Sequence, residues 1–307
     1  MKKLFIISIA ILASTFSQAQ FQTGINQGAF QNLAPELENP ALSMNISVPQ
    51  INFMAGTRID GFNNRPVFQH LFFSSSLGNN TGAAMHVRRE KAGLSTVVKA
   101  DLSFLYTLNI APEDAKKIVF HGTASLGQNS FNIHDAIVND IGDPVLTGGT
   151  INQPTVNAAA GLAFFSQNTF YAGITVAQLI PTRSDFMNDL WANEAEMLFS
   201  FQAAYQFSIN EYSSLQAWGS GALSSGIFAY QAGLDYKYRK IFWVGAGYRD
   251  NSSLIFNAGV TAQSFSFGYS ISYSSWADAV SNGATYATIS NVLFVRKVFN
   301  ERKSGRE

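Results

Sequence analysis

The feature that most constrains this chain is an alternation of large apolar and small polar residues with a period of two. In residues 264–274 one face carries Phe265, Phe267, Tyr269, Ile271 and Tyr273, and the other carries only serine and Gly268. Successive side chains of a strand point to opposite faces, so this segment is predicted to be a strand with one apolar face. The same pattern recurs in residues 97–108, 195–208 and 228–239.

The whole chain contains fourteen segments with this pattern, an even number, as bacterial outer-membrane barrels have. The predicted strands are residues 51–57, 67–75, 82–89, 94–110, 117–127, 156–165, 170–179, 196–207, 214–223, 227–238, 242–249, 254–262, 265–273 and 288–299. If both termini are periplasmic, the short connections fall on one side. The three longest connections, residues 129–155, 180–195 and 276–287, then fall together on the extracellular side. Residues 184–195 are expected to form a short helix in one of these outer loops.

Composition distinguishes a membrane barrel from a soluble β-sandwich, whose strands also alternate apolar and polar residues. Charged residues make up 13% of the chain, against about 25% in typical soluble domains. The polar faces carry mainly Ser, Gly, Ala, Gln and Asn rather than Lys and Glu, and no stretch approaches the roughly 20 apolar residues of a membrane-spanning helix. The predicted fold is therefore an all-β, antiparallel, up-and-down transmembrane barrel of about fourteen strands with periplasmic termini.

The N-terminus has the pattern of a secretory signal. Lys2 and Lys3 precede an apolar run, and Ser17 and Ala19 supply the small residues of a cleavage site after Ala19. The expected organisation is a signal peptide (1–19), a periplasmic or plug segment (20–45), an outer-membrane barrel (46–299) and a short tail (300–307). For residues 20–45 a plug, a periplasmic lead and a disordered leader remain open. We expect localisation in the cell outer membrane.

The sequence contains no recognisable catalytic constellation. Cysteine is absent, which excludes disulfides and thiolate chemistry. The four histidines, His70, His86, His121 and His134, are far apart in sequence without metal-binding spacing. No nucleophile elbow or phosphate-binding loop occurs. We therefore expect no enzyme activity, cofactor or metal, and the formal net charge of 0 gives no reason to expect a nucleic-acid partner.

Charged residues on the predicted polar faces are candidates for the lumen wall. They form either an electrostatic constriction or binding lining, or ion pairs that fill the interior of a mid-sized barrel. These residues are Lys99, Asp101, Asp235, Lys237, Arg239 and Arg249. In residues 139–146, Asp140 and Asp143 resemble part of a calcium loop, but an Asp-Pro turn explains the segment as well.

Several blocks along the chain resemble the PorP/SprF family of type IX secretion system outer-membrane proteins from Bacteroidota. The first block is Asn39-Pro40-Ala41, which is followed by residues 140–146 with Asp140, Gly142, Asp143 and Pro144. Residues 161–164 and 170–179, with Gly173 and Gln178, resemble the family's central hairpin. Residues 242–249, with Trp243, Tyr248 and Arg249, and residues 267–270 resemble its late strands.

This resemblance implies a non-enzymatic role in the type IX system, which secretes proteins and supports gliding motility. It also implies partners: outer-membrane lipid, type IX components and the C-terminal domain of a secreted adhesin. The alternative function is an outer-membrane channel or transporter for hydrophobic small molecules, which a barrel of this size with an N-terminal plug also suits.

Overall fold

A computed structural model of the chain describes most of the barrel. The described residues are 33–45, 48–59, 65–132, 149–167, 169–181, 183–186, 191–194, 196–250, 253–277 and 285–299. The predicted signal peptide, the tail, His134 and the motif residues Asp140, Gly142, Asp143 and Pro144 lie outside them. No helix among the described residues is long and apolar enough to cross a membrane.

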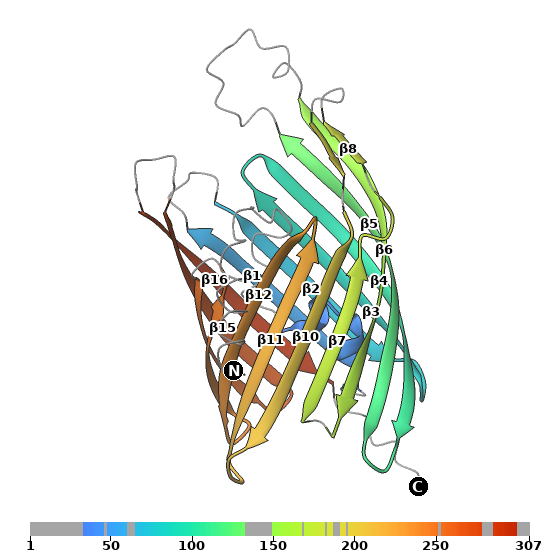
Figure 1. Cartoon of the computed structure of the whole chain (residues 1–307), viewed down its shortest axis with the longest axis vertical. Coiled ribbons are helices and arrows are strands. Elements are labelled where there is room, and N and C mark those ends of the chain that lie inside the picture. The colour runs from blue at the N-terminus through green and yellow to red at the C-terminus, as the bar shows by residue number, and fades with distance from the viewer. Residues whose placement is uncertain are drawn as a thin grey trace, which may run out of the picture.

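The chain folds into one closed antiparallel barrel, in which β1 pairs with β16 to complete the ring (Figure 1). Fourteen strands form the barrel, in agreement with the number predicted from the alternation. They are β1 (Gln50–Ile59), β2 (Val67–Ser76), β3 (Thr81–Ala92), β4 (Ser95–Ala111), β5 (Lys116–Asn132), β6 (Thr150–Ser166), β7 (Phe170–Ala177), β10 (Leu198–Ser208), β11 (Ser213–Ser224), β12 (Ile227–Tyr238), β13 (Phe242–Arg249), β14 (Ser253–Ala262), β15 (Phe265–Ala277) and β16 (Thr285–Val298).

The two faces of the barrel wall differ as the alternation predicts. On β15, Phe265, Phe267 and Tyr269 point outward and are exposed, whereas Ser270 and Ser272 point inward and are buried. Closing the sheet pairs the backbone of every strand with two neighbours, so no sheet edge has to face hydrocarbon. The apolar exterior is therefore the surface that a membrane covers.

The connections at the two ends of the barrel differ, because every long connection is at the same end. One end, here called the turn end, has short connections at residues 77–80, 112–115, 167–169, 209–212, 239–241 and 263–264. In the β12–β13 turn, both Arg239 (φ 51°) and Lys240 (φ 56°) have positive φ, as a two-residue type I′ hairpin turn requires. The other end, the loop end, carries all the longer connections, together with short ones at residues 93–94, 225–226 and 250–252. The ends of β1 and β16 that lead to the chain termini lie at the turn end.

Two neighbouring strands, β5 and β6, extend several residues further toward the loop end than the sequence pattern indicates. β5 continues to Asn132 and β6 begins at Thr150, so the predicted long connection at residues 129–155 is shorter than expected. The outward side chains here are polar, and Gln128 and Ser130 both donate hydrogen bonds to Asn152 Oδ1 (2.9 and 2.7 Å). These extensions escape prediction because a strand outside the apolar band needs no apolar outward face.

The helix expected in residues 184–195 is wrong. This region contains a two-stranded antiparallel sheet of β8 (Arg183–Phe186) and β9 (Trp191–Glu194). Pairing of the two segments satisfies their backbone groups across the hairpin. The paired residues are five to eleven positions apart in sequence, so the helix propensity of the segment alone did not reveal the pairing.

Candidate functional site: a plugged lumen with a pocket at the turn end

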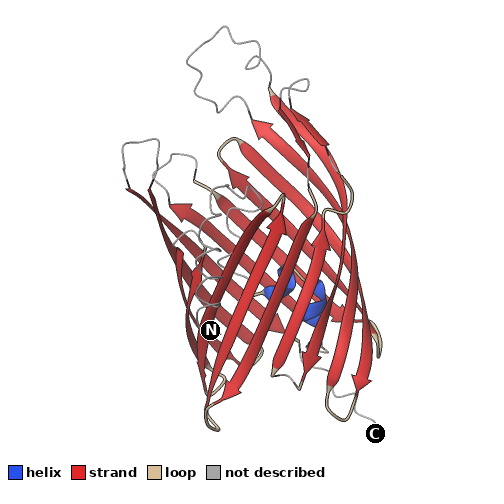
Figure 2. Ribbon diagram, in the orientation of Figure 1, coloured by secondary structure: helices blue, strands red, loops and turns tan. Residues whose placement is uncertain are grey.

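Residues 33–45 lie inside the barrel, next to the strand wall. They form two short 3-10 helices, η2 (Pro35–Leu37) and η3 (Pro40–Asn45), visible in the lumen in Figure 2. We call residues 33–45 the plug. Its apolar side chains pack against wall residues that point inward: Ala41, Leu42 and Met44 against Phe72, Leu105, Val119 and Phe165, and Leu33 and Ala34 against Met54, Phe68, Val292 and Phe294.

Asn39 attaches the plug directly to the wall at the β6–β7 pair. Its Nδ2 donates hydrogen bonds to the carbonyl oxygens of Leu162 (3.0 Å) and Ile174 (3.3 Å), and its Oδ1 accepts one from the Ala41 amide (3.1 Å). Gly173 leaves room for this contact, because a Cβ at that position would lie 2.5 Å from Asn39 Nδ2. Two motif residues 134 positions apart in sequence, Asn39 and Gly173, thus meet in the fold, and Pro40 begins η3 beside them.

Charged groups hold the plug at three further points. Glu36 pairs with Arg296 of β16 and accepts a hydrogen bond from Asn52 of β1, and Arg296 Nε also donates to Asn52 Oδ1 (2.9 Å). Glu38 Oε2 accepts a hydrogen bond from Gln202 Nε2 (2.9 Å) on β10. On the other side, Lys117 Nζ donates to the Met44 carbonyl (2.7 Å). The plug is therefore tied to both halves of the wall.

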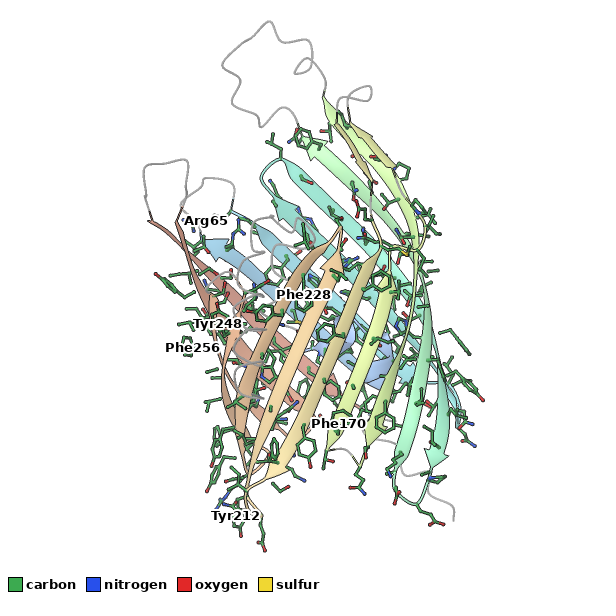
Figure 3. The ribbon with its side chains drawn as sticks, in the orientation of Figure 1. Arg65, Phe170, Tyr212, Phe228, Tyr248 and Phe256 are labelled. Carbon is green, nitrogen blue, oxygen red and sulfur yellow. The ribbon has the colours of Figure 1, made fainter. Side chains whose placement is uncertain are left out.

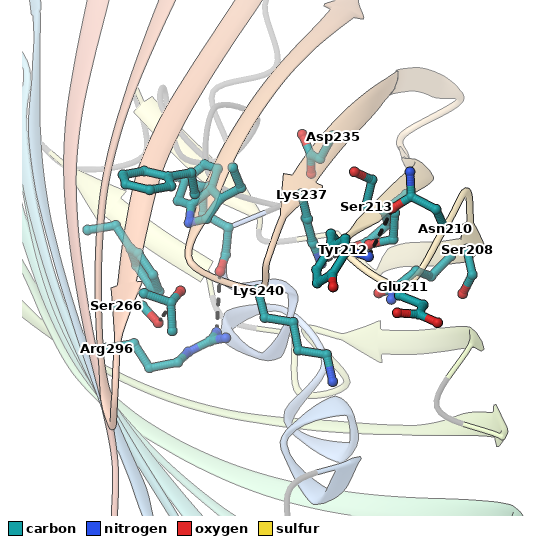
Figure 4. A pocket seen from close by; sticks show the side chains of 18 residues that line it. Ser208, Asn210, Glu211, Tyr212, Ser213, Asp235, Lys237, Lys240, Ser266 and Arg296 are labelled. Carbon is teal, nitrogen blue, oxygen red and sulfur yellow. Dashed lines mark hydrogen bonds between the residues drawn. The ribbon is translucent and has the colours of Figure 1, made fainter.

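A cavity of about 450 Å³ lies beside the plug, along the inner wall of β10–β16 at the turn end (Figure 4). Its lining mixes charges (Glu211, Asp235, Lys237, Lys240 and Arg296) with hydroxyl and amide groups and with aromatic rings. Lys237 Nζ donates to Gln216 Oε1 (2.5 Å), and Asp235 Oδ1 accepts from Asn257 Nδ2 (3.0 Å). This is a polar pocket in which the two β12 charges, Asp235 and Lys237, are already hydrogen-bonded.

Trp243, a motif residue, forms part of the aromatic lining of this pocket. Its indole lies against Gly259 and Gly268 of the two following strands, where a Cβ would come within 2.2 and 2.6 Å of Trp243 Cζ2. These glycines have no side chain and so provide a flat seat for the ring. The contact of Trp243 with these glycines could not be predicted from the sequence, because it depends on the register between β13, β14 and β15.

We expect Gly259→Ala to lower the free energy of unfolding by about 1–3 kcal/mol, the usual effect of forcing extra volume into a packed site. The added methyl would also approach the Phe267 carbonyl oxygen at 2.4 Å, so a movement of the indole alone would not relieve the clash. Urea titration in lipid vesicles, followed by tryptophan fluorescence, measures this change. Gly219→Ala is the matched control, because a Cβ at Gly219 would have its nearest atom 3.6 Å away. Equal losses of stability in both variants would show that contact with Trp243 does not cause the effect.

Five of the six charged residues predicted to line the lumen do point inward. Lys99 and Asp101 lie on the inward face of β4, Asp235 and Lys237 on that of β12, and Arg249 on that of β13. Arg239 does not line the lumen, and that expectation is wrong. It lies exposed in the β12–β13 turn, with its guanidinium over the rings of Tyr212 and Tyr238. Arg239 has a positive φ, so it belongs to the turn and not to the strand. The alternation of inward and outward side chains therefore no longer predicts where the Arg239 side chain points.

The histidines are closer together than their sequence spacing suggests. His70 Nδ1 and His86 Nε2 are 3.0 Å apart and their rings stack, because β2 and β3 place these residues diagonally opposite each other. His70 Nε2 lies 3.6 Å from Glu90, and His86 Nδ1 lies 3.5 Å from Asp101. Within the described ranges, however, no group of three or more His, Asp or Glu side chains has a metal-binding arrangement.

Two other motif residues have no contact with the plug or pocket. Tyr248 is exposed on the outer face of β13 (Figure 3). Gln178 directly follows β7 and has a positive φ of 60°. The structure thus gathers Asn39, Pro40 and Gly173 at the plug and Trp243 at the pocket, and it separates Tyr248 and Gln178 from both.

Solved structures with a similar fold are outer-membrane channels. The CymD monoaromatic hydrocarbon channel matches with a TM-score of 0.54 and 11% identity, over 90% of this chain and 94% of CymD. The Pseudomonas putida toluene transporter TodX matches with a TM-score of 0.56 and 12% identity, over 87% and 93%. A Pseudomonas aeruginosa FadL homologue matches with 0.51 and 9%, over 83% and 91%. At such low identity these likenesses support the barrel fold alone.

Comparison with curated proteins gives no match in sequence. A family model, by contrast, covers almost the whole barrel. Residues 19–289 match the model described as type IX secretion system membrane protein PorP/SprF. This range includes the plug and thirteen complete strands, and it agrees with the resemblance of the sequence blocks. Together with the closed barrel and its apolar exterior, the match supports an outer-membrane location. The chain belongs to the PorP/SprF family of type IX secretion system membrane proteins.

Proposed function

We propose that this barrel is a non-enzymatic component of the type IX secretion system that assists secretion or surface attachment of a specific adhesin-like cargo by binding its C-terminal domain. Family membership supports the system. The observation that carries the rest is the plug, which Asn39, Glu36, Glu38 and Lys117 tie to the wall. A lumen occupied in this way does not suit a wide, open pore, and it leaves the walls and loops of the barrel for recognition of a partner.

We further propose that the turn end is periplasmic and the loop end is extracellular. Short connections at one end and long ones at the other are typical of bacterial outer-membrane barrels with periplasmic termini. In this orientation the pocket beside the plug opens toward the periplasm, where secretion components assemble. The long loops and the β8–β9 hairpin then face the medium, where a cargo would be held.

Transport of hydrophobic small molecules is the weaker alternative. The structural neighbours are named as hydrocarbon and toluene channels, but sites for apolar solutes are lined mainly by apolar and aromatic side chains. The pocket here contains Asp235, Lys237 and Arg296. Gln202, Gln231 and Arg249 lie in one row on the same inner wall, closer to the loop end. Desolvating these groups around an apolar solute would be unfavourable.

Purification of an affinity-tagged copy from detergent-solubilised native outer membranes tests the proposal. We expect mass spectrometry to find an adhesin C-terminal domain or type IX components enriched over a tagged barrel of another family. Recovery of the barrel alone, under conditions in which a known translocon of the same membranes stays intact, would contradict the secretion role. A steady conductance of the unmodified barrel in planar bilayers would favour transport instead.

A further inference from the structure

Two cations lie among aromatic rings on the outer surface at the turn end. The guanidinium of Arg239 lies 5.3 Å from the ring centroid of Tyr212 and 5.4 Å from that of Tyr238. Both rings are exposed. Tyr212 lies at the end of the barrel in Figure 3, where it also lines the pocket. Lys240 follows directly in the same turn and is also exposed.

Lys297 forms a similar arrangement on the last strand. Its Nζ lies 4.8 Å from the ring centroid of Phe265 and 4.9 Å from that of Phe299. Lys297 and Phe265 are cross-strand partners in β16 and β15, and Phe265 belongs to the outward face of its strand. Lys297 is therefore on the membrane-facing side of the wall. Arg239 lies exposed in the β12–β13 turn, next to the ring of Tyr238, which is on the outer face of β12.

Neither cation has a carboxylate partner among the residues that the structure describes. Other basic residues of the barrel do: Arg296 pairs with Glu36, and Lys116 Nζ lies 2.8 Å from Asp114 Oδ2 in the β4–β5 turn. Contact with a ring face holds a cation in place electrostatically but does not use its N–H groups as hydrogen-bond donors. Arg239 and Lys297 thus keep donors available toward the membrane.

The chemistry that such donors fit at this depth is a lipid phosphate. Aromatic girdles mark the level of the headgroups in membrane barrels, and a guanidinium can bind phosphate oxygens in a bidentate manner. Glu211, which lines the nearby pocket, forms no ion pair with Arg239 or Lys240 within 4 Å in the described part of the chain. The positive charge of this surface is therefore not cancelled locally.

We propose that Arg239 and Lys297, with the rings of Tyr212, Tyr238, Phe265 and Phe299, form binding sites for the phosphate of an anionic glycerophospholipid in the leaflet at the turn end. The sites lie on the β11–β16 side of the barrel. The β4–β5 turn differs, because it carries Glu113 and Asp114 and its Lys116 is already paired. This inference concerns the outer wall and does not depend on the secretion role.

Native mass spectrometry of the purified mature barrel, titrated with phosphatidylglycerol or phosphatidylcholine of identical acyl chains, tests these sites. We expect tighter binding of phosphatidylglycerol by the unmodified protein. Arg239→Gln and Lys297→Gln should each weaken this binding about fivefold, the usual effect of one basic residue near an anionic membrane surface. Binding of phosphatidylcholine should not change.

Lys116→Gln is the matched control, because it removes the same charge at the same end of the barrel from a residue that already has a partner. Retention of the unmodified protein's phosphatidylglycerol affinity by the double variant would overturn the proposal, as would equal binding of the two lipids by the unmodified protein. Tighter binding of lipid A than of phosphatidylglycerol, lost in the double variant, would overturn the assignment to a glycerophospholipid. Heat-dependent mobility in gels verifies that each variant is folded.

Discussion

Replacement of Arg296 by methionine is expected to lower the free energy of unfolding by about 3–5 kcal/mol, the range typical of breaking a buried ion pair by removing one partner. The side chain of Glu36 is only 5% exposed, so without Arg296 its carboxylate would be left inside the lumen with the Asn52 amide as its hydrogen-bond donor among the described residues. Urea titration of the barrel in lipid vesicles, followed by tryptophan fluorescence, measures the change.

Two further variants show whether the loss of stability comes from the unpaired carboxylate of Glu36. Lys116→Met removes one partner of the exposed Lys116–Asp114 pair, whose side chains are 40% and 53% exposed, and should change stability by less than about 1 kcal/mol. The double variant Glu36→Gln/Arg296→Met leaves no unpaired carboxylate and should be more stable than Arg296→Met alone. If Arg296→Met is as stable as Lys116→Met, the ion pair does not hold the plug.

Gly173→Ala is expected to detach the plug from the β6–β7 wall. The added Cβ would lie 2.5 Å from Asn39 Nδ2, so Asn39 would have to give up its hydrogen bonds to Leu162 and Ile174. Overpacking of this kind typically destabilises by about 1–3 kcal/mol. We expect single-channel recordings in planar bilayers to show frequent openings in Gly173→Ala and few in the unmodified protein.

The same substitution on β5, which is separated from β7 by β6, serves as the control. A Cβ at Gly122 of β5 meets no atom within 4 Å, so Gly122→Ala should leave the recordings unchanged. A double-mutant cycle isolates the contact: if Gly173→Ala acts through Asn39, combining it with Asn39→Ala should add much less than its effect alone. Full additivity of the two substitutions would show that Gly173→Ala acts elsewhere.

Much of this fold could be predicted from the sequence because strand periodicity is local. The serine-rich alternation of residues 264–274 identified β15 and its outward face, and the same pattern gave the number of strands in the barrel. It failed where the local signal changes. β5 and β6 continue beyond the apolar band with polar outward residues, β8 and β9 pair across a hairpin, and a turn residue, Arg239, leaves the strand face.

A plug was one of three interpretations that the sequence left open for residues 20–45, and the wall residues that hold it could not be predicted. Inward positions such as Phe68 and Phe72 on β2 and Phe294 on β16 are apolar, so these strands are apolar on both faces. Such strands indicate something apolar in the lumen but do not say which segment fills it. Likewise, His70 and His86 are sixteen residues apart and become neighbours only through the β2–β3 register.

The sequence by itself determined the class of fold, the number of barrel strands and the surface that meets the membrane, because each depends on the direction of successive side chains along one strand. Only the tertiary structure decided that Asn39 meets Gly173, that Glu36 pairs with Arg296 and that Trp243 rests on Gly259. Those contacts join residues far apart in the chain. They depend on closure of the barrel and on the register between strands, which no local pattern records.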